Sequence, residues 1–103
     1  YDVIILDPPG FAKHLSSLPQ ASIGYRNLNA EGMKKVKRGG ILFTFSCSQV
    51  VDAGLFRKLV FQAAAMTSRQ VRILHQLHQP SDHPISIYHP EGEYLKGLVL
   101  QVE

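Results

Sequence analysis

Two short apolar runs, each followed at once by polar residues, most constrain how this chain can fold. Tyr1–Leu6 ends at Asp7, Pro8 and Pro9, and Ile41–Phe45 ends at Ser46, Cys47 and Ser48. Both runs are continuously apolar rather than alternating, which is typical of strands buried on both faces of a sheet. The sequence therefore predicts two interior strands.

The segments around these strands predict helices and further strands. Ser22–Arg38 has helical periodicity and stops at Gly39-Gly40, where glycine can adopt a left-handed cap. Asp52 is an expected N-cap for a second helix that runs to Met66. One face of the first helix is predicted to carry Ile23, Leu28, Met33 and Val36.

Two more strands are expected at Val71–Leu77, with Val71, Ile73 and Leu77 on one side, and at Tyr94–Val102. The proline-containing stretch His78–Gly92 is expected to be a loop, with a short strand at Ile85–Tyr88 as an option. The order strand–helix–strand–helix–strand–strand predicts one α/β domain over residues 1–103, whose early strands are parallel.

A helical crossover makes the first two strands parallel neighbours, so their carboxyl ends meet at one edge of the sheet, where ligands bind. Asp7 and Cys47 are thereby predicted to face one substrate. Prolines end the strand and stiffen its exit, Gly10 permits a close approach, and Phe11 could stack on a planar base. Asp-Pro-Pro-Gly is also an ordinary turn sequence, and both interpretations stay open.

Cys47 also has two interpretations. A lone cysteine is commonly a small buried hydrophobic residue. Here it lies past a strand end and before a helix, whose first amides favour the nucleophilic thiolate. We interpret it as catalytic jointly with Asp7.

Composition and charge bear on the cellular compartment of the protein and on its partners. The 103 residues include one cysteine and no long apolar run, so we expect a cytoplasmic protein that does not enter a membrane. A net charge of +3 is compatible with an RNA partner. Lys13 and His14 are the expected phosphate contacts, whereas the basic run from Lys34 to Arg38 suits a solvated helix end. His75 and His78 should point to opposite faces of a strand, so no metal site is predicted.

Three stretches, "LDPPGFAKH", "GGILFTFSCS" and "DHPISIYHPEGEYLKGLVL", resemble the C-terminal half of the catalytic domain of the large-subunit rRNA cytosine-5 methyltransferases. These enzymes are S-adenosylmethionine-dependent and Rossmann-like. The resemblance implies a seven-stranded, mostly parallel sheet with an antiparallel last strand. This chain would supply its last four strands, without the glycine-rich cofactor loop.

The resemblance also implies site roles. Cys47 would add to C6 of a flipped cytosine, and Asp7 would hold the ring. The substrate would also contact Pro8, Pro9, Phe11 and Lys13, and the cofactor would touch Asp7 and Pro8. A fragment of this kind should have a free edge at Tyr1–Leu6, through which it could dimerise.

Two other functions remain open. An exocyclic-amine methyltransferase would need Asp-Pro-Pro and an aromatic residue but leave Cys47 idle. A non-catalytic RNA-binding or assembly domain would keep the fold without turnover.

Overall fold

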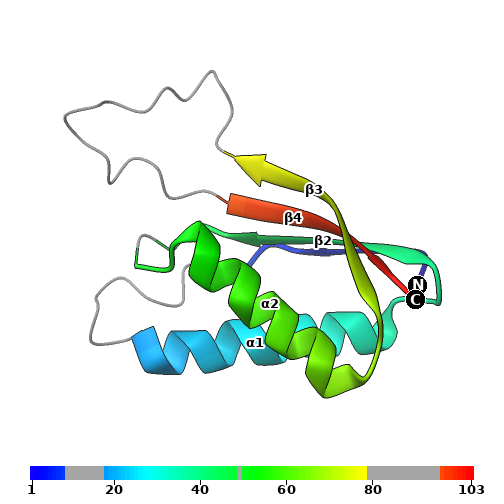
Figure 1. The fold of residues 1–103 in the computed structure, drawn as a ribbon, viewed down its shortest axis with the longest axis horizontal. Helices are drawn as coiled ribbons and strands as arrows, with labels where there is room; N and C mark the ends of the chain where they lie inside the picture. The colour runs from blue at the N-terminus through cyan, green and yellow to red at the C-terminus, as the bar shows by residue number, and fades with distance from the viewer. Residues whose placement is uncertain (9–17, 49, 79–95) are drawn as a thin grey trace.

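The computed structural model describes residues 1–8, 18–48, 50–78 and 96–103, which form four strands and two helices (Figure 1). In chain order these are β1 (Val3–Leu6), α1 (Leu18–Lys35), β2 (Gly40–Ser46), α2 (Ala53–Thr67), β3 (Val71–His78) and β4 (Lys96–Val102). The predicted order of elements is confirmed. The expected strand at Ile85–Tyr88 lies outside the described residues, as does most of the expected loop around it.

The strands form one mixed sheet in the order β1-β2-β4-β3. β1 and β2 are parallel neighbours, with Leu6 opposite Thr44, as the crossover predicted. β4 lies between β2 and β3 and is antiparallel to both, so it alone is reversed. The antiparallel last strand is confirmed, although just one of the three pairings is parallel. The seven-stranded sheet stays a prediction.

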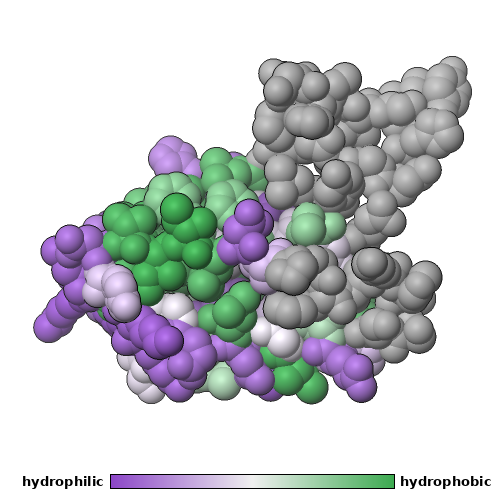
Figure 2. Space-filling model, turned by 180° about the vertical axis from the view of Figure 1, so that it is seen from behind, coloured by the Kyte–Doolittle hydropathy of each residue, from purple (hydrophilic) through white to green (hydrophobic). Residues whose placement is uncertain are grey.

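Both helices lie on the same side of the sheet (Figure 1). The prediction that Tyr1–Leu6 is buried on both faces is therefore wrong for this chain. Ile4 and Leu6 face the helices and are half-buried, whereas Val3 is 53% and Ile5 65% exposed on the other face. Seen from the side on which β1 lies, the molecule shows a broad hydrophobic area (Figure 2).

The helix ends follow from local residues. Gly39 has a φ of 81°, a left-handed conformation that side chains rarely adopt, and it turns the chain from α1 into β2. Asp52 caps α2, because its Oδ1 accepts a hydrogen bond from the amide of Leu55 at 2.7 Å. The turn at Gly39 and the cap at Asp52 are as predicted, whereas α1 runs from Leu18 to Lys35 instead of from Ser22 to Arg38.

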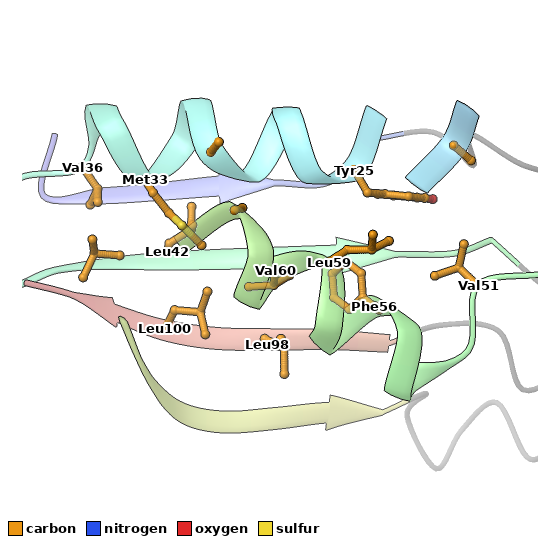
Figure 3. Packing of buried hydrophobic residues seen from close by; sticks show 14 residues of the cluster. Tyr25, Met33, Val36, Leu42, Val51, Phe56, Leu59, Val60, Leu98 and Leu100 are labelled. Atoms are coloured by element: carbon orange, nitrogen blue, oxygen red, sulfur yellow. The ribbon is translucent and has the colours of Figure 1, made fainter. Parts of the chain in front are cut away.

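The core fills the space between the helices and the sheet (Figure 3). Tyr25 of α1 and Phe56 of α2 meet edge to face with ring centroids 6.1 Å apart. On α1 the buried stripe consists of Ala21, Tyr25, Asn29 and Met33 and continues to Val36 just past the helix. Ile23, predicted for this face, is 49% exposed, because a position two residues from Ala21 and Tyr25 points away from the stripe.

An irregularity in β3 overturns another sequence expectation. Val71 and Ile73 pair with Val102 and Leu100, but the register shifts between Ile73 and His75, so Leu77 pairs with Gly97. One extra residue reverses the alternation of side chains that follows it. Leu77 therefore lies on the opposite face from Val71 and Ile73, instead of on the same side as predicted.

Arg69 ties the helix ends to the C-terminus of the chain. Its Nη1 donates to the carbonyl oxygens of Met33 and of Val36, the latter at 2.6 Å, and its Nε donates to the carbonyl of Glu103 at 3.0 Å. These bonds satisfy carbonyl groups at the end of α1 that lack helical partners. Neither helix of the described residues is long and apolar enough to cross a bilayer.

Candidate active site at the carboxyl ends of the parallel strands

Asp7 and Cys47 follow directly on two adjacent parallel strands. β1 ends at Leu6 and β2 ends at Ser46, and both strands run in the same direction. Because Leu6 lies opposite Thr44, Cys47 is displaced from Asp7 by two residues along the strands, about 7 Å. The structure thus brings the two residues to the same edge of the sheet, as the sequence predicted.

The surroundings of the two residues differ. Asp7 is exposed, Pro8 is half-buried, and Cys47 is a half-buried free thiol. Ile4 and Leu6 of β1 face the helices. Every second residue of β2, up to its last residue Ser46, is buried and faces the helices as well. Continued alternation puts both Asp7 and Cys47 on the face away from the helices. Of the other predicted site residues, Pro9, Phe11 and Lys13 lie outside the described residues.

Hydrogen bonds hold the turn that carries Cys47. The amide of Ser48 donates to Oγ of Ser46 at 3.3 Å, which closes the turn across Cys47. Nζ of Lys96 donates to the carbonyl oxygen of Ser48 at 2.8 Å. Ser46 and Ser48 are both buried, so these contacts are shielded from water and fix the backbone on either side of the thiol.

Lys96 is the first residue of β4 and lies between the last residues of β2 and β3, opposite Ser46 and His78. It is only 7% exposed. Burial lowers the pKa of its ammonium group, and the negative charges of Cys47 and Asp52 act in the opposite direction. A buried cation is therefore held at the strand ends, where it fixes the Ser48 carbonyl in the turn that contains Cys47.

Sequence reasoning assigned no role to Lys96. The available signal was a single charged residue in the apolar run Leu95–Leu100. Lysine is rarely buried unless something in the structure requires it. Only the pairing of β4 with β2, which joins residues far apart in the chain, shows that Lys96 adjoins Cys47.

A sizeable cavity lies elsewhere in the described residues. It measures about 660 Å³ between α2 and β3, and its walls are mainly apolar, with Phe61, Ala64 and Leu98 among them. Neither Asp7 nor Cys47 lines it. Within the described ranges, no cluster of three or more metal-binding side chains is present.

The comparisons with known proteins agree with this architecture. The chain is 50% identical over 102 residues to the protein named ribosomal RNA large subunit methyltransferase I from Shewanella frigidimarina, and 49% identical to the protein of that name from Alteromonas mediterranea. Each comparison covers 99% of this chain and 26% of the relative, so the chain spans about a quarter of the length of these relatives. No protein-family model matches it.

Two solved structures share the fold. A protein from Streptococcus mutans named as a SAM-dependent methyltransferase matches with a TM-score of 0.79 at 22% identity, over 99% of this chain and 25% of that one. SMU.776, named as a methyltransferase and complexed with SAH, matches with a TM-score of 0.79 at 24% identity, over 99% of this chain and 26% of that one. The chain therefore has the fold of one segment of these methyltransferase structures, and its sequence is similar throughout to about a quarter of the ribosomal RNA large subunit methyltransferase I proteins.

Proposed function

We propose that this chain is part of an S-adenosylmethionine-dependent methyltransferase that acts on large-subunit rRNA. The observation that carries the proposal is the 50% identity, over 99% of the chain, to proteins named ribosomal RNA large subunit methyltransferase I. The alignment spans 102 of the 103 residues and so includes both strand ends that carry the candidate site. The similar fold of a methyltransferase complexed with SAH supports the choice of cofactor.

We further propose that methylation occurs at C5 of a cytosine and that Cys47 is the nucleophile. The support is geometric and chemical. A thiol and a carboxylate follow adjacent parallel strands, at the edge of the sheet where such folds bind ligands. The turn that carries the thiol is held by a hydrogen bond from the buried Lys96 to the Ser48 carbonyl.

The residues at the end of β1 fit one wall of a cofactor site. Asp7 is exposed and can accept hydrogen bonds, while the half-buried Pro8 offers a rigid apolar surface beside it. The sequence carries no G-x-G-x-x-G loop, so Asp7 and Pro8 would contribute contacts rather than a whole site. S-adenosylmethionine, when bound, supplies an electrophilic methyl group.

In the proposed reaction, Sγ of Cys47 forms a bond to C6 of the cytosine, and the ring's electron pair shifts so that C5 becomes nucleophilic. The Asp7 carboxyl group would hold the ring at its N3 edge and stabilise the charge that develops there. After C5 has gained the methyl group, loss of the C5 proton returns an electron pair to the ring. The Sγ–C6 bond then breaks, and the free thiolate is restored.

RNA is the proposed partner, and the basic run lies away from the candidate site. Lys35 and Lys37 lie near the start of β2, where the amide of Lys37 donates to the carbonyl of Tyr1. Cys47 lies past the other end of this strand, roughly 20 Å away. Lys34 and Lys37 also form ion pairs with Glu31 and Asp2. These observations favour a solvated helix end for this run.

Replacement of Cys47 by serine in the whole protein tests the proposal. Transfer of labelled methyl from S-adenosylmethionine to unmodified large-subunit rRNA should fall by roughly a thousandfold or more, because a hydroxyl is a far weaker nucleophile than a thiolate. Unchanged S-adenosylmethionine binding would show that the variant is folded. Undiminished transfer would contradict the covalent mechanism and favour an exocyclic-amine methyltransferase.

A further inference from the structure

The open groove between α2 and β3 has features of a binding surface. Its volume is about 660 Å³, and the buried side chains of Val60, Leu98 and Leu100 give it an apolar floor. Two exposed side chains also line it: Ile73 of β3, and Phe61 of α2, which is 75% exposed. A hollow of this size with an exposed aromatic ring at its side is typical of a surface that binds a ligand.

Two arginines that line the groove supply positive charge. Arg57 is exposed in the second turn of α2, and Arg69 follows the end of this helix. Within the residues that the structure describes, neither arginine forms an ion pair, and no acidic side chain lines the groove. The carbonyl groups that accept hydrogen bonds from Arg69 are neutral. The groove therefore combines apolar surface with positive charge that no carboxylate neutralises.

The two arginines lie at different points along the groove. α2 begins shortly after the turn that carries Cys47 and runs back along the sheet (Figure 1). Arg57 is near this end of the helix, and Arg69 lies beyond the other end. An occupant with repeated negative charges and flat apolar groups matches this arrangement. Single-stranded RNA has both, because each nucleotide carries a phosphate and a base that can stack on an aromatic ring.

A protein segment is the alternative occupant, since apolar grooves also bind amphipathic helices. Such a segment would have to place a carboxylate opposite each arginine and bury both ion pairs, and the desolvation of buried ion pairs is costly. RNA brings a phosphate at every nucleotide, and the release of its counterions favours binding to cations. Charge complementarity therefore favours RNA.

We infer that the α2–β3 groove is an RNA contact surface apart from the candidate active site, in which a single-stranded segment stacks a base on Phe61 and places phosphates beside Arg57 and Arg69. The inference rests on the proposed function where it takes the RNA to be rRNA. Stacking and phosphate contacts tolerate any sequence, so they can be measured without methyl transfer.

The experiment measures equilibrium binding of the whole protein to a labelled oligouridine of about 12 nucleotides, at several salt concentrations. Oligouridine contains no cytosine, so the proposed reaction cannot occur on it. Phe61→Leu keeps an apolar side chain but removes the ring, and it should weaken binding roughly tenfold because a stacked base is lost. Phe61→Tyr keeps the ring and should bind within about twofold of wild type.

Arg57→Ala tests the phosphate contact. It should reduce the slope of log Kd against log salt concentration by about 0.7, the value of one phosphate contact on a single strand. Lys58→Ala is the matched control and should leave the slope unchanged, because Lys58 is an exposed cation of α2 that does not line the groove. Met66→Leu controls for Phe61→Leu, since Met66 is a 54% exposed apolar residue of α2 outside the groove.

Wild-type affinity and salt dependence in both Phe61→Leu and Arg57→Ala would overturn the inference and favour a protein segment as the occupant. Equal losses in Arg57→Ala and Lys58→Ala would also overturn it, because they would show an effect of net charge alone. If Phe61→Leu and Arg57→Ala lose affinity as expected but the wild-type protein transfers no methyl groups to rRNA, the groove inference stands and the proposed function fails.

Discussion

At the scale of single residues, Gly97 shows how one close approach fixes the position of β4 beside β2. Gly97 lies opposite Phe45 in the sheet, and a Cβ at this position would be 2.5 Å from Cδ1 of the Phe45 ring. The ring therefore covers the glycine directly. Any side chain at position 97 would displace Phe45, one strand residue before the turn that carries Cys47.

Gly97→Ala should lower the free energy of unfolding by about 1–3 kcal/mol, because the new methyl group forces the Phe45 ring to move. Gly54→Ala is the matched control. Gly54 is exposed on α2, and a Cβ added there would lie 3.5 Å from Oδ1 of Asp52, an ordinary contact distance. Alanine at this position should therefore raise the free energy of unfolding by about 0.5–1 kcal/mol. Urea unfolding measures both variants. Equal effects would contradict the close packing.

At the scale of elements, Arg69 joins parts of the chain that local sequence does not connect. It follows α2, yet it donates to carbonyl groups at the end of α1 and to Glu103 after β4. Its planar guanidinium group can serve several acceptors at once. The relative placement of α1, α2 and the C-terminal strand thus depends partly on one side chain.

Arg69→Ala should lower the free energy of unfolding by about 1–3 kcal/mol, since several charge-assisted hydrogen bonds are lost and the partly buried carbonyls of Met33 and Val36 lose their donor. Arg57→Ala, on the exposed side of α2, should change it by less than about 0.5 kcal/mol. Denaturant unfolding followed by circular dichroism compares them. Similar losses in the two variants would show that the carbonyl bonds contribute little.

The elements themselves could be predicted, because their signals are local. Apolar runs, Gly39 and the Asp52 cap placed the strands and helices close to their observed bounds. The errors concern contacts between elements. The register shift after Ile73 reverses the side of Leu77, and the role of Lys96 depends on the pairing of β4 with β2. Neither of these follows from the neighbouring residues.

At the scale of the whole molecule, the two helices cover one face of the sheet, and the other face is exposed at β1. The continuous apolar run of β1 predicted cover on both faces, yet Val3 and Ile5 are exposed. β1 also lies at an edge of the sheet. The other edge strand, β3, has an irregular register, a feature that discourages pairing, whereas the register of β1 with β2 is regular. β1 is therefore the stronger template for association.

The isolated 103-residue chain should therefore self-associate through β1, with its apolar face adding to edge pairing. Ile5→Lys should shift it towards monomer in sedimentation velocity, because a charge on this face opposes packing. Phe61→Lys, which places a charge at an exposed position on α2, should leave the distribution unchanged. A clean monomer for the unaltered chain would contradict this expectation.

Covalent trapping shows whether Cys47 attacks the target base. Whole protein, S-adenosylmethionine and rRNA that contains 5-fluorocytosine should form a stable protein–RNA adduct, because fluorine at C5 cannot leave as a proton does and the Sγ–C6 bond persists. The adduct should resist denaturing gel electrophoresis and map to the Cys47 peptide, and Cys47→Ser should form none. An adduct of equal yield in Cys47→Ser, or no adduct from wild-type protein that methylates unmodified rRNA, would contradict it.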